Sequence, residues 1–222
     1  MALDINKVYN FVQFIANKNQ AGGYLTPVRF NLAAPIAQQE IINEDYQQFQ
    51  SSQFNSDVLS PLIRRRILNP NSEGVLAYPS DYMHITSIRA KQFYIDSYGA
   101  TKSREVNVDQ LTDDELGFRL SSDLLQPTEA YPIMAQYDTF MQFYPTTTSS
   151  IIFTYIKKPT DPEWGYTVSN GRAVYNSGAS VQFTLPDNTL NRVAYKICSY
   201  LGINIREQEL YSYAEQMKQA EK

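Results

Sequence analysis

The sequence predicts an α+β fold, with a helical bundle built from the two ends of the chain and an antiparallel β-sandwich or sheet inserted between them. In residues 1–73 and 186–222, apolar side chains recur at helical spacing. In residues 74–185, short β-like runs are separated by Pro and Gly. The 222 residues are enough for one core with an elaborated insert. We therefore predict an N-terminal helical part, a β-rich insert and a C-terminal helical part with these boundaries.

The N-terminal part contains two predicted helices. Asp4 is the predicted N-cap of the first helix. The apolar face of this helix consists of Ile5, Val8, Val12 and Ile15. Thr26 followed by Pro27 has the pattern of a second helix start. The apolar face of the second helix consists of Phe30, Ala33, Ala37 and Ile41. Pro35 falls inside this helix and is expected to kink it or split it in two.

A polar segment follows these helices. Residues 38–54 are rich in Gln, with aromatic residues between them. We interpret the segment as the polar end of the second helix and a following connection, with an exposed surface of amide side chains. Residues 56–68 come next and contain the only basic run of the sequence, Arg64-Arg65-Arg66.

The insert is predicted to contain several short antiparallel strands. The β-like runs are 75–78, 83–88, 92–95, 133–137, 139–144, 151–156 and 181–186. Between these runs, Thr112 precedes Asp113-Asp114-Glu115, a pattern that predicts a capped helical turn.

Two helices are predicted in the C-terminal part. The apolar face of the first consists of Leu190, Val193, Ala194, Ile197, Cys198 and Leu201. Gly202 is placed to end this helix, because glycine accepts the left-handed conformation common after a helix. The apolar stripe of the last helix consists of Leu210, Tyr213, Ala214 and Met217. This stripe needs a partner, either the N-terminal helices of the same chain or a groove on another protein.

Composition indicates a folded protein that uses aromatic surfaces. Apolar residues make up 43% of the chain and charged residues 19%, which excludes a disordered class. The 17 Tyr and 11 Phe suit half-hydrated interfaces, although strand aromatics of an ordinary β-rich domain are the alternative. No apolar run reaches the roughly 20 residues that span a bilayer, and the start of the chain lacks a signal-peptide pattern. The single Cys excludes an internal disulfide, as expected for assembly in a reducing cytoplasm.

The charge is acidic and unevenly distributed. The formal net charge of −4 argues against a sequence-reading DNA-binding protein, which must neutralise phosphates. Residues 1–73 contain six basic and six acidic groups, and residues 186–222 contain five of each. Residues 74–185 contain eight basic and twelve acidic groups, so the acidic excess lies in the predicted insert.

The sequence contains no constellation typical of an enzyme. It lacks a phosphate-binding glycine loop, zinc-type Cys/His spacing and a nucleophile elbow. His84 has no metal or triad partner in the sequence, and Cys198 lies on an apolar helix face, so we interpret both as structural. Asp113-Asp114-Glu115 is interpreted as the solvated start of a helix. We predict no catalytic residue, no cofactor and no metal site.

The basic run is a candidate interaction site. Arg64, Arg65 and Arg66 could bind phosphate or the carboxylates of a neighbouring protein. The alternatives are a solvated face or ion pairing within the chain. A contact with another subunit or protein is favoured over DNA because the run is short and the chain is acidic.

An irregular arm is the second candidate. Residues 157–166 contain two prolines and a glycine, with Trp164 and Tyr166 near the end. Trp164 is either an anchor in the core or an interface hot spot. We expect the arm to reach onto an adjacent subunit or an adjacent ring.

The motifs of the last third of the chain come in a distinctive order. The strand 151–156 runs into Lys157-Lys158-Pro159, and Trp164-Gly165-Tyr166 follows. A short strand ending in Leu185-Pro186 comes next, and then two helices separated by Leu201-Gly202-Ile203. This order resembles the C-terminal part of the head-to-tail connector proteins of short-tailed bacteriophages. These are the tail tubular protein A-like adaptor and ring proteins, including those of crAss-like phages.

The resemblance extends over nearly the whole chain. In the N-terminal part it rests on Val8-Tyr9-Asn10 and on Gly23-Tyr24-Leu25-Thr26-Pro27. In the insert the matching motifs are Tyr78-Pro79-Ser80-Asp81-Tyr82, residues 127–133 and Phe143-Tyr144-Pro145. These motifs occur in the same order as in the connectors.

The resemblance implies a structural protein of the virion, assembled in the host cytoplasm. It implies a homo-oligomeric ring of about twelve subunits that contacts the portal protein and neighbouring tail proteins. Genomic DNA would pass through this ring without sequence-specific binding, and an acidic wall would suit a sliding backbone. The connectors commonly dock their C-terminal segment into the portal, so Leu210, Tyr213 and Met217 are candidate interface residues. No membrane contact is implied.

A second function class fits part of the same sequence. A Tyr-rich β-sandwich that binds carbohydrate or protein could belong to a tail fibre or another appendage. Such a module would be a monomer or a trimer with an exposed aromatic platform. It would need no helices joining the two ends of the chain.

Overall fold

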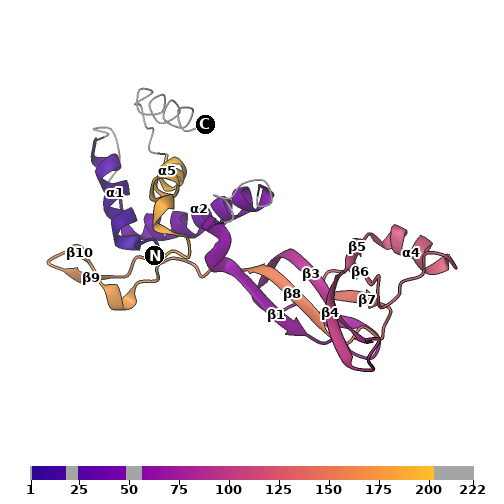
Figure 1. The fold of residues 1–222 in the computed structure, drawn as a ribbon. Helices are drawn as coiled ribbons and strands as arrows, with labels where there is room; N and C mark the ends of the chain where they lie inside the picture. The colour runs from indigo at the N-terminus through magenta and orange to yellow at the C-terminus, as the bar shows by residue number, and fades with distance from the viewer. Residues whose placement is uncertain (1, 19–24, 49–56, 203–222) are drawn as a thin grey trace, which may run out of the picture. The chain divides into compact units, whose positions relative to one another are not determined.

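The computed structural model describes residues 2–18, 25–48 and 57–202 and shows a mixed α+β fold, as predicted at the level of the α+β class (Figure 1). The chain divides into two compact units. The first unit combines residues 1–61 with the chain from residue 159 onward, and the second unit consists of residues 62–158.

These boundaries differ from the predicted boundaries after residues 73 and 185. Residues 63–68 were placed in the N-terminal helical part, but they form a strand paired with residues 151–156 and belong to the second unit. Residues 159–185 were placed in the β-rich insert. They belong to the first unit, because Thr160 and Trp164 are hydrogen-bonded to side chains of an N-terminal helix.

In the first unit, α1 (Ile5–Lys18) begins where the sequence predicts it. The Asp4 Oδ1 accepts a hydrogen bond from the Asn6 N–H at 2.7 Å, as an N-cap does. The buried apolar residues of this segment are Leu3, Ile5, Val8, Tyr9, Val12 and Ala16. Ile15, predicted on the same face, is half-buried.

The second helix, α2 (Pro27–Gln47), starts at the predicted Thr26-Pro27. The Thr26 hydroxyl accepts a hydrogen bond from a backbone N–H of the first turn at 3.4 Å. The helix continues through Pro35, so the predicted split is wrong. Ala34 and Ala37, on either side of the proline, are fully buried, and this burial offsets the hydrogen bond that Pro35 cannot donate.

The helix α5 (Leu190–Tyr200) packs against both α1 and α2. Its buried residues are Val193, Ala194, Ile197 and Cys198, all on the predicted apolar face. Gly202 follows with φ +67°, the left-handed conformation expected after the helix. The packing brings a helix from late in the chain onto the two N-terminal helices.

Charged side chains connect α5 to α2 beside this apolar face. The Arg192 guanidinium donates to both carboxylate oxygens of Asp45, at 3.0 and 2.8 Å, and Asp45 is buried. Lys196 pairs with Glu40 at 2.9 Å and also with Glu44. The bidentate pair fixes how the two helices are aligned, because its geometry allows little sliding.

Gln38 joins α2 to two irregular stretches of the chain. Its Nε2 donates to the Thr160 carbonyl at 2.9 Å, and its Oε1 accepts from the Thr184 N–H at 2.8 Å and the Thr184 hydroxyl at 3.0 Å. The side chain is buried. The predicted exposed amide surface is therefore wrong for Gln38, which satisfies backbone groups outside regular structure.

Residues 181–186 pair with other segments at isolated positions rather than as the predicted strand. The bridges are Glu163 with Val181 and Ala2 with Pro186. The Leu3 N–H also donates to the Leu185 carbonyl at 2.9 Å. The start of the chain is thus held against a segment near its end, next to the short 3₁₀ helix η3 (Asp187–Thr189).

A β-hairpin projects from the same part of the chain. Its strands are β9 (Tyr166–Ser169) and β10 (Arg172–Tyr175), and it is followed by the 3₁₀ helix η2 (Ser177–Ala179). Asn170 and Gly171 form the turn with φ values of 51° and 73°. Two consecutive positive φ values are typical of the Asn-Gly turn that matches strand twist.

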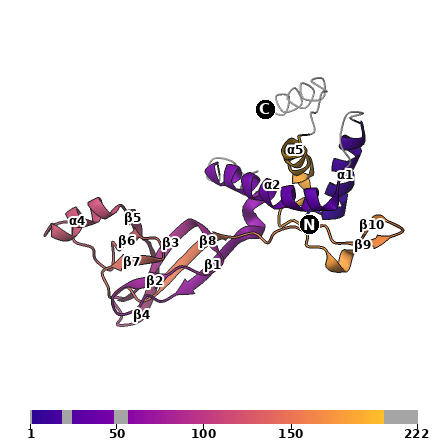
Figure 2. The same cartoon turned by 180° about the vertical axis from the view of Figure 1, so that it is seen from behind.

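The second unit contains two four-stranded sheets (Figures 1 and 2). The first sheet is antiparallel, in the order β1 (Ile63–Leu68), β8 (Ile151–Lys157), β3 (Tyr82–Ile95) and β4 (Thr101–Asn107). The second has the order β2 (Val75–Ala77), β7 (Phe140–Tyr144), β6 (Ile133–Gln136) and β5 (Asp109–Leu111), and only β5 and β6 are parallel. The short 3₁₀ helix η1 (Ser60–Leu62) precedes β1. The predicted runs 83–88 and 92–95 are one long strand, β3.

Both sheets contribute side chains to one core. This cluster comprises Leu76, Ile88, Ala90, Met134, Met141, Phe143, Ile151, Phe153 and Tyr155. At the β5–β6 side, α4 (Asp113–Ser121) packs Leu116 against Ile133 and Ala135. Thr112 and Glu115 form the predicted capping box, each side chain bonded to the backbone of the other.

We predict that Gln38→Ala lowers the free energy of unfolding by about 1–3 kcal/mol, because it removes a buried amide that bonds the Thr184 N–H and the Thr160 carbonyl. Urea unfolding followed by circular dichroism measures the change. Gln47→Ala, at the exposed end of the same helix, is the control and should change stability by less than about 0.5 kcal/mol. Equal effects of the two changes would contradict the role assigned to Gln38.

Candidate interaction surfaces

Trp164 is buried in the first unit. Its side chain is 3% exposed, and its ring stacks on Tyr9 with centroids 4.0 Å apart and 13° between the planes. The indole Nε1 donates to the Asn6 Oδ1 at 3.1 Å. The Trp164 N–H donates to the Asn31 Oδ1 at 2.9 Å, and the Trp164 carbonyl accepts from the Asn31 Nδ2 at 3.2 Å. Trp164 therefore attaches the arm to α1 and α2 of its own chain.

This burial corrects the expectation that the arm reaches an adjacent subunit through Trp164. Of the two roles left open by the sequence, the structure shows the core anchor. Tyr166 lies beside it, with ring centroids 5.8 Å apart, and is partly exposed at the start of the hairpin. Between them, a Cβ at Gly165 would lie 2.4 Å from the backbone of Ala179, so only glycine fits there.

The basic run forms most of strand β1. Successive side chains of a strand point to opposite faces, so Arg64, Arg65 and Arg66 do not converge on one phosphate. Arg65 pairs with Glu105 at 3.0 Å, and Glu105 also pairs with Arg89 at 2.8 Å. Arg65 and Arg66 thus form ion pairs within the chain, one of the alternatives that the sequence left open, while Arg64 is exposed on the edge strand. A contact of this run with another subunit stays a prediction.

Arg66 belongs to a cluster with Asp81 and Tyr155. The hydroxyl of the fully buried Tyr155 donates to the Asp81 Oδ1 at 2.7 Å, and the Arg66 Nη2 lies 3.4 Å from the Asp81 Oδ2. The hydrogen bond from Tyr155 and then the charge of Arg66 lower the pKa of Asp81. Burial and then the hydrogen bond to Asp81 raise the pKa of Tyr155 to about 12. The cluster fastens β1 to the neighbouring strand and loop.

The other predicted interface residues, Leu210, Tyr213 and Met217, lie outside the described residues. The docking of residues 206–222 into the portal therefore stays a prediction.

His84 and Cys198, the two residues that the sequence analysis weighed for catalysis, lie in β3 and on the buried face of α5. Burial lowers the pKa of His84, which lies in β3. Burial raises the pKa of the Cys198 thiol to about 11. In the ranges 2–18, 25–48 and 57–202, no group of His, Cys, Asp and Glu side chains could hold a metal ion. Across these same ranges, no helix is long and apolar enough to cross a membrane.

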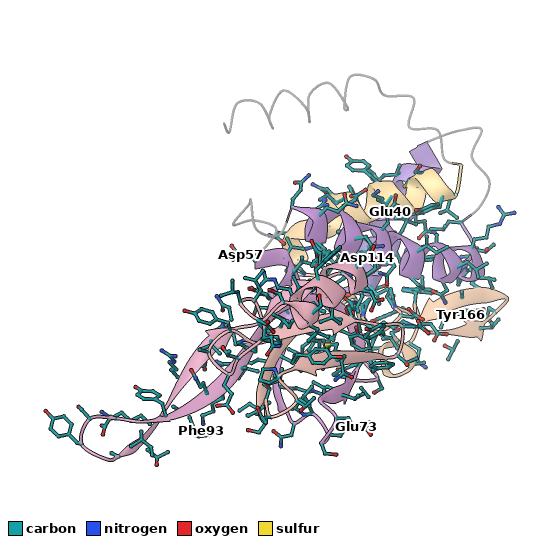
Figure 3. The ribbon with its side chains drawn as sticks, turned by 90° about the vertical axis from the view of Figure 1, so that its right-hand side faces the viewer. Glu40, Asp57, Glu73, Phe93, Asp114 and Tyr166 are labelled. Carbon is teal, nitrogen blue, oxygen red and sulfur yellow. The ribbon has the colours of Figure 1, made fainter. Side chains whose placement is uncertain are left out.

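A ribbon of the second unit exposes large apolar side chains that the sequence analysis did not single out. Strand β3 pairs with β8 as far as Ala90, whereas residues 91–95 continue in register with residues 101–105 of β4. The exposed apolar side chains of this ribbon are Phe93, Tyr94, Ile95 and Tyr98. Figure 3 shows Phe93 on this narrow extension. We call residues 91–104 the aromatic ribbon.

The sequence contains a signal for this exposure. Phe93, Tyr94 and Ile95 are consecutive, so strand geometry places apolar side chains on both faces of the ribbon. A second layer packed on one face of a two-stranded ribbon leaves the side chains of the other face exposed. Apolar residues on both faces are therefore exposed unless each face is covered.

A second apolar surface lies at and after α4. Its exposed members are Phe118, Leu120, Leu124, Leu125 and Tyr131, which we call the α4 surface. Leu116 is the buried contact of the helix, and Phe118, two residues on, points away from it. Phe118 is 77% exposed and Leu124 is 95% exposed.

The first unit also has exposed apolar side chains. Val28, Leu32 and Ile36 lie four residues apart along α2 and form a stripe. Val168 and Val174 are exposed on the β9–β10 hairpin. The α2 side chains share one face of the helix, whereas Val168 and Val174 lie on opposite faces of the hairpin, because Val168 is opposite Ala173 and Val174 is opposite Thr167.

We predict that Trp164→Ala lowers the free energy of unfolding by about 3–5 kcal/mol, because it removes a buried ring stacked on Tyr9. Trp164→Phe should cost less, since it keeps an aromatic ring and loses the Nε1 bond to Asn6. Urea unfolding followed by far-UV circular dichroism measures both. Full stability of Trp164→Ala combined with lost oligomerisation would restore the interface role.

We predict that Tyr155→Phe changes how stability depends on alkaline pH. A raised pKa in the folded state stabilises the protein below the unfolded value near 10, and this contribution is lost as pH rises toward about 12. Wild type should therefore lose about 1 kcal/mol more than Tyr155→Phe between about pH 9 and about pH 11. Urea unfolding at the two pH values measures this, and parallel losses would contradict the assignment.

Neither a known protein-family model nor a curated protein sequence matches this chain. Functional interpretation therefore depends on the geometry of the exposed surfaces and on the order of the sequence motifs.

Proposed function

We propose that this protein is a head-to-tail adaptor of a short-tailed bacteriophage, forming a ring between portal and tail. In this proposal the unit made of both chain ends is a helical bundle that forms the ring body. The second unit is a β-sandwich insert that faces neighbouring tail components. The order of sequence motifs and the formation of one unit by the two ends of the chain support this arrangement.

The observation that carries the proposal is the exposure of large apolar side chains on both units. The aromatic ribbon and the α4 surface lie on the second unit, and the α2 stripe and the hairpin lie on the first. A protein that works as a monomer gains nothing from several such surfaces, whereas a ring subunit must contact two neighbours and the rings above and below.

The adaptor acts in this proposal through its surfaces and not through catalysis. The net charge of −4 suits a conduit, because like charge keeps the DNA backbone from binding the wall. The segment 206–222, with Leu210, Tyr213 and Met217, docks into the portal. The assembled protein resides in the virion, with about twelve copies in the ring.

The competing function is a binding module of a tail fibre or appendage. Exposed tyrosines such as Tyr98 and Tyr131 would serve as its aromatic platform. The packing of α5 against α1 and α2 favours the adaptor, because a β-sandwich binding module needs no helical unit built from both ends.

Electron microscopy of the purified protein, alone and mixed with portal protein from the same virion, tests the proposal. We expect closed rings of about twelve copies, or addition of a ring to the portal. Rings should persist in His84→Ala and Cys198→Ser when circular dichroism shows that these variants are folded, since neither residue performs chemistry. Monomers or trimers under both conditions would overturn the adaptor proposal and favour the binding module.

A further inference from the structure

The aromatic ribbon and the α4 surface carry opposite charge. Residues 91–105 contain three basic and two acidic groups, and both acidic groups are already paired, Asp96 with Lys102 and Glu105 with Arg65 and Arg89. Residues 109–131 contain one basic group and six acidic groups. Both surfaces belong to the second unit, so their local structures are set within one compact body. The unit therefore has one basic and one acidic apolar surface.

On the ribbon, the basic groups lie directly beside the exposed rings. The Lys91 Nζ is 5.3 Å from the Phe93 ring centroid, and the Arg104 guanidinium is 5.8 Å from that of Tyr94. Strand alternation puts Phe93 and Tyr94 on opposite faces, so each face has one aromatic ring and one cation. The remaining pair, Lys102 with Asp96, is internally neutralised at 2.8 Å.

At the ribbon tip, Tyr98 is 92% exposed and Ile95 is 73% exposed. The turn that holds them is well bonded, because the Asp96 carboxylate accepts hydrogen bonds from the N–H groups of Tyr98 and Ala100, each at 2.9 Å. The tip is thus an ordered apolar end, which loses little conformational entropy when it docks.

On the α4 surface, the carboxylates are held by neutral donors or point to solvent. Tyr137 donates to Asp113 at 2.8 Å, and Thr112 holds Glu115 in the capping box. Within the described residues, none of the six acidic groups of this stretch forms an ion pair; they are Asp109, Asp113, Asp114, Glu115, Asp123 and Glu129. This negative charge is available to an external cation.

The two surfaces do not cover each other within one copy. The apolar side chains of both are exposed, and Figure 3 shows the labelled Phe93 and Asp114 at separate places. Both apolar surfaces therefore stay exposed to solvent after the chain has folded.

We propose that the aromatic ribbon of one copy docks on the α4 surface of the next copy, an interface that rests on the proposed ring assembly. The ribbon tip packs Ile95 and Tyr98 against the apolar α4 surface, and Lys91 and Arg104 approach its unpaired carboxylates. Aromatic anchors supply the apolar contact, and opposite charge selects the partner.

The charge pattern also selects the symmetry of the contact. Ribbon against ribbon would bring two basic surfaces together, and α4 against α4 would bring two acidic surfaces together, so both twofold contacts are disfavoured. A contact between two different surfaces is heterologous, and repeating it produces a closed ring when the rotation closes. The same contact therefore explains why a ring, and not a dimer, is the expected assembly.

Disulfide cross-linking between two single-cysteine-substituted chains tests this interface. A chain with Tyr98→Cys is mixed with a chain with Leu124→Cys and mildly oxidised. We expect a cross-linked dimer of one chain of each kind, and little cross-linking of either chain alone. The native Cys198 is buried and should not react. Val168→Cys, exposed on the other hairpin, replaces Tyr98→Cys as the matched control.

Charge reversal provides the second measurement. Lys91→Glu with Arg104→Glu on the Tyr98→Cys chain should slow cross-linking about tenfold at low salt. Asp114→Lys with Asp123→Lys on the Leu124→Cys chain should restore the rate. High salt should reduce the difference, because these charges are exposed.

A yield no higher than that of the Val168→Cys control, or a rate insensitive to charge reversal, overturns the interface. Its failure is distinct from failure of the adaptor proposal. Rings in electron micrographs without this cross-link would reject the interface and keep the adaptor function. The cross-link without rings would support the contact and count against the ring.

Discussion

The fold of the first unit depends on the burial of Trp164 against the N-terminal helices. The chain leaves the second unit at Lys158 and has no regular strand or helix until β9, so its path is set by individual contacts. The indole stacks on Tyr9, and the Asn31 amide pairs with both backbone groups of Trp164. Gln38 then fixes the backbone on either side of the hairpin, at Thr160 and Thr184. Without these contacts the late helix α5 would have no defined approach to α1 and α2.

The contacts of Trp164 and Gln38 explain how the chain can contain an entire second unit between residues 61 and 159. The insert begins in β1 and ends in β8, and these strands are paired, with Ile63 opposite Ile156. Its two ends are therefore held side by side by the sheet itself, so the insert closes its own loop. The first unit has only to hold the chain where it re-enters from the insert, and the contacts of Trp164 with α1 and α2 do this. Each unit can accordingly evolve its surfaces with little effect on the packing of the other.

Local signals in the sequence predicted the elements better than the boundaries between units. Asp4, Thr26-Pro27, Thr112 and Gly202 are caps, whose effect lies within one helical turn, and each occurs where it was predicted. The placement of β1 was missed because three consecutive arginines hide a strand whose partner is nearly ninety residues away. The sequence did not decide whether Trp164 is a core anchor or an interface residue, because apolar periodicity predicts burial only within regular helices and strands. Gln38 was missed because an amide that bonds distant backbone groups has the same local pattern as an exposed one.

The edges of the first sheet show why the aromatic ribbon is the surface to be explained. Strand β1 is an edge strand, and its charged arginines disfavour pairing with a strand of another molecule. Arg65 is paired with Glu105, and Arg66 with Asp81. The second sheet has edge strands of three residues, β2 and β5, which are too short to recruit another strand. On the ribbon, the same chain places Phe93, Tyr94 and Ile95 in succession beyond the cover of the sheet. The core of the unit is formed without these three side chains, so their apolar character is not needed to fill it. The proposed contact between copies accounts for this exposure, and the positive charge beside the rings is the reason for proposing an acidic surface as its partner.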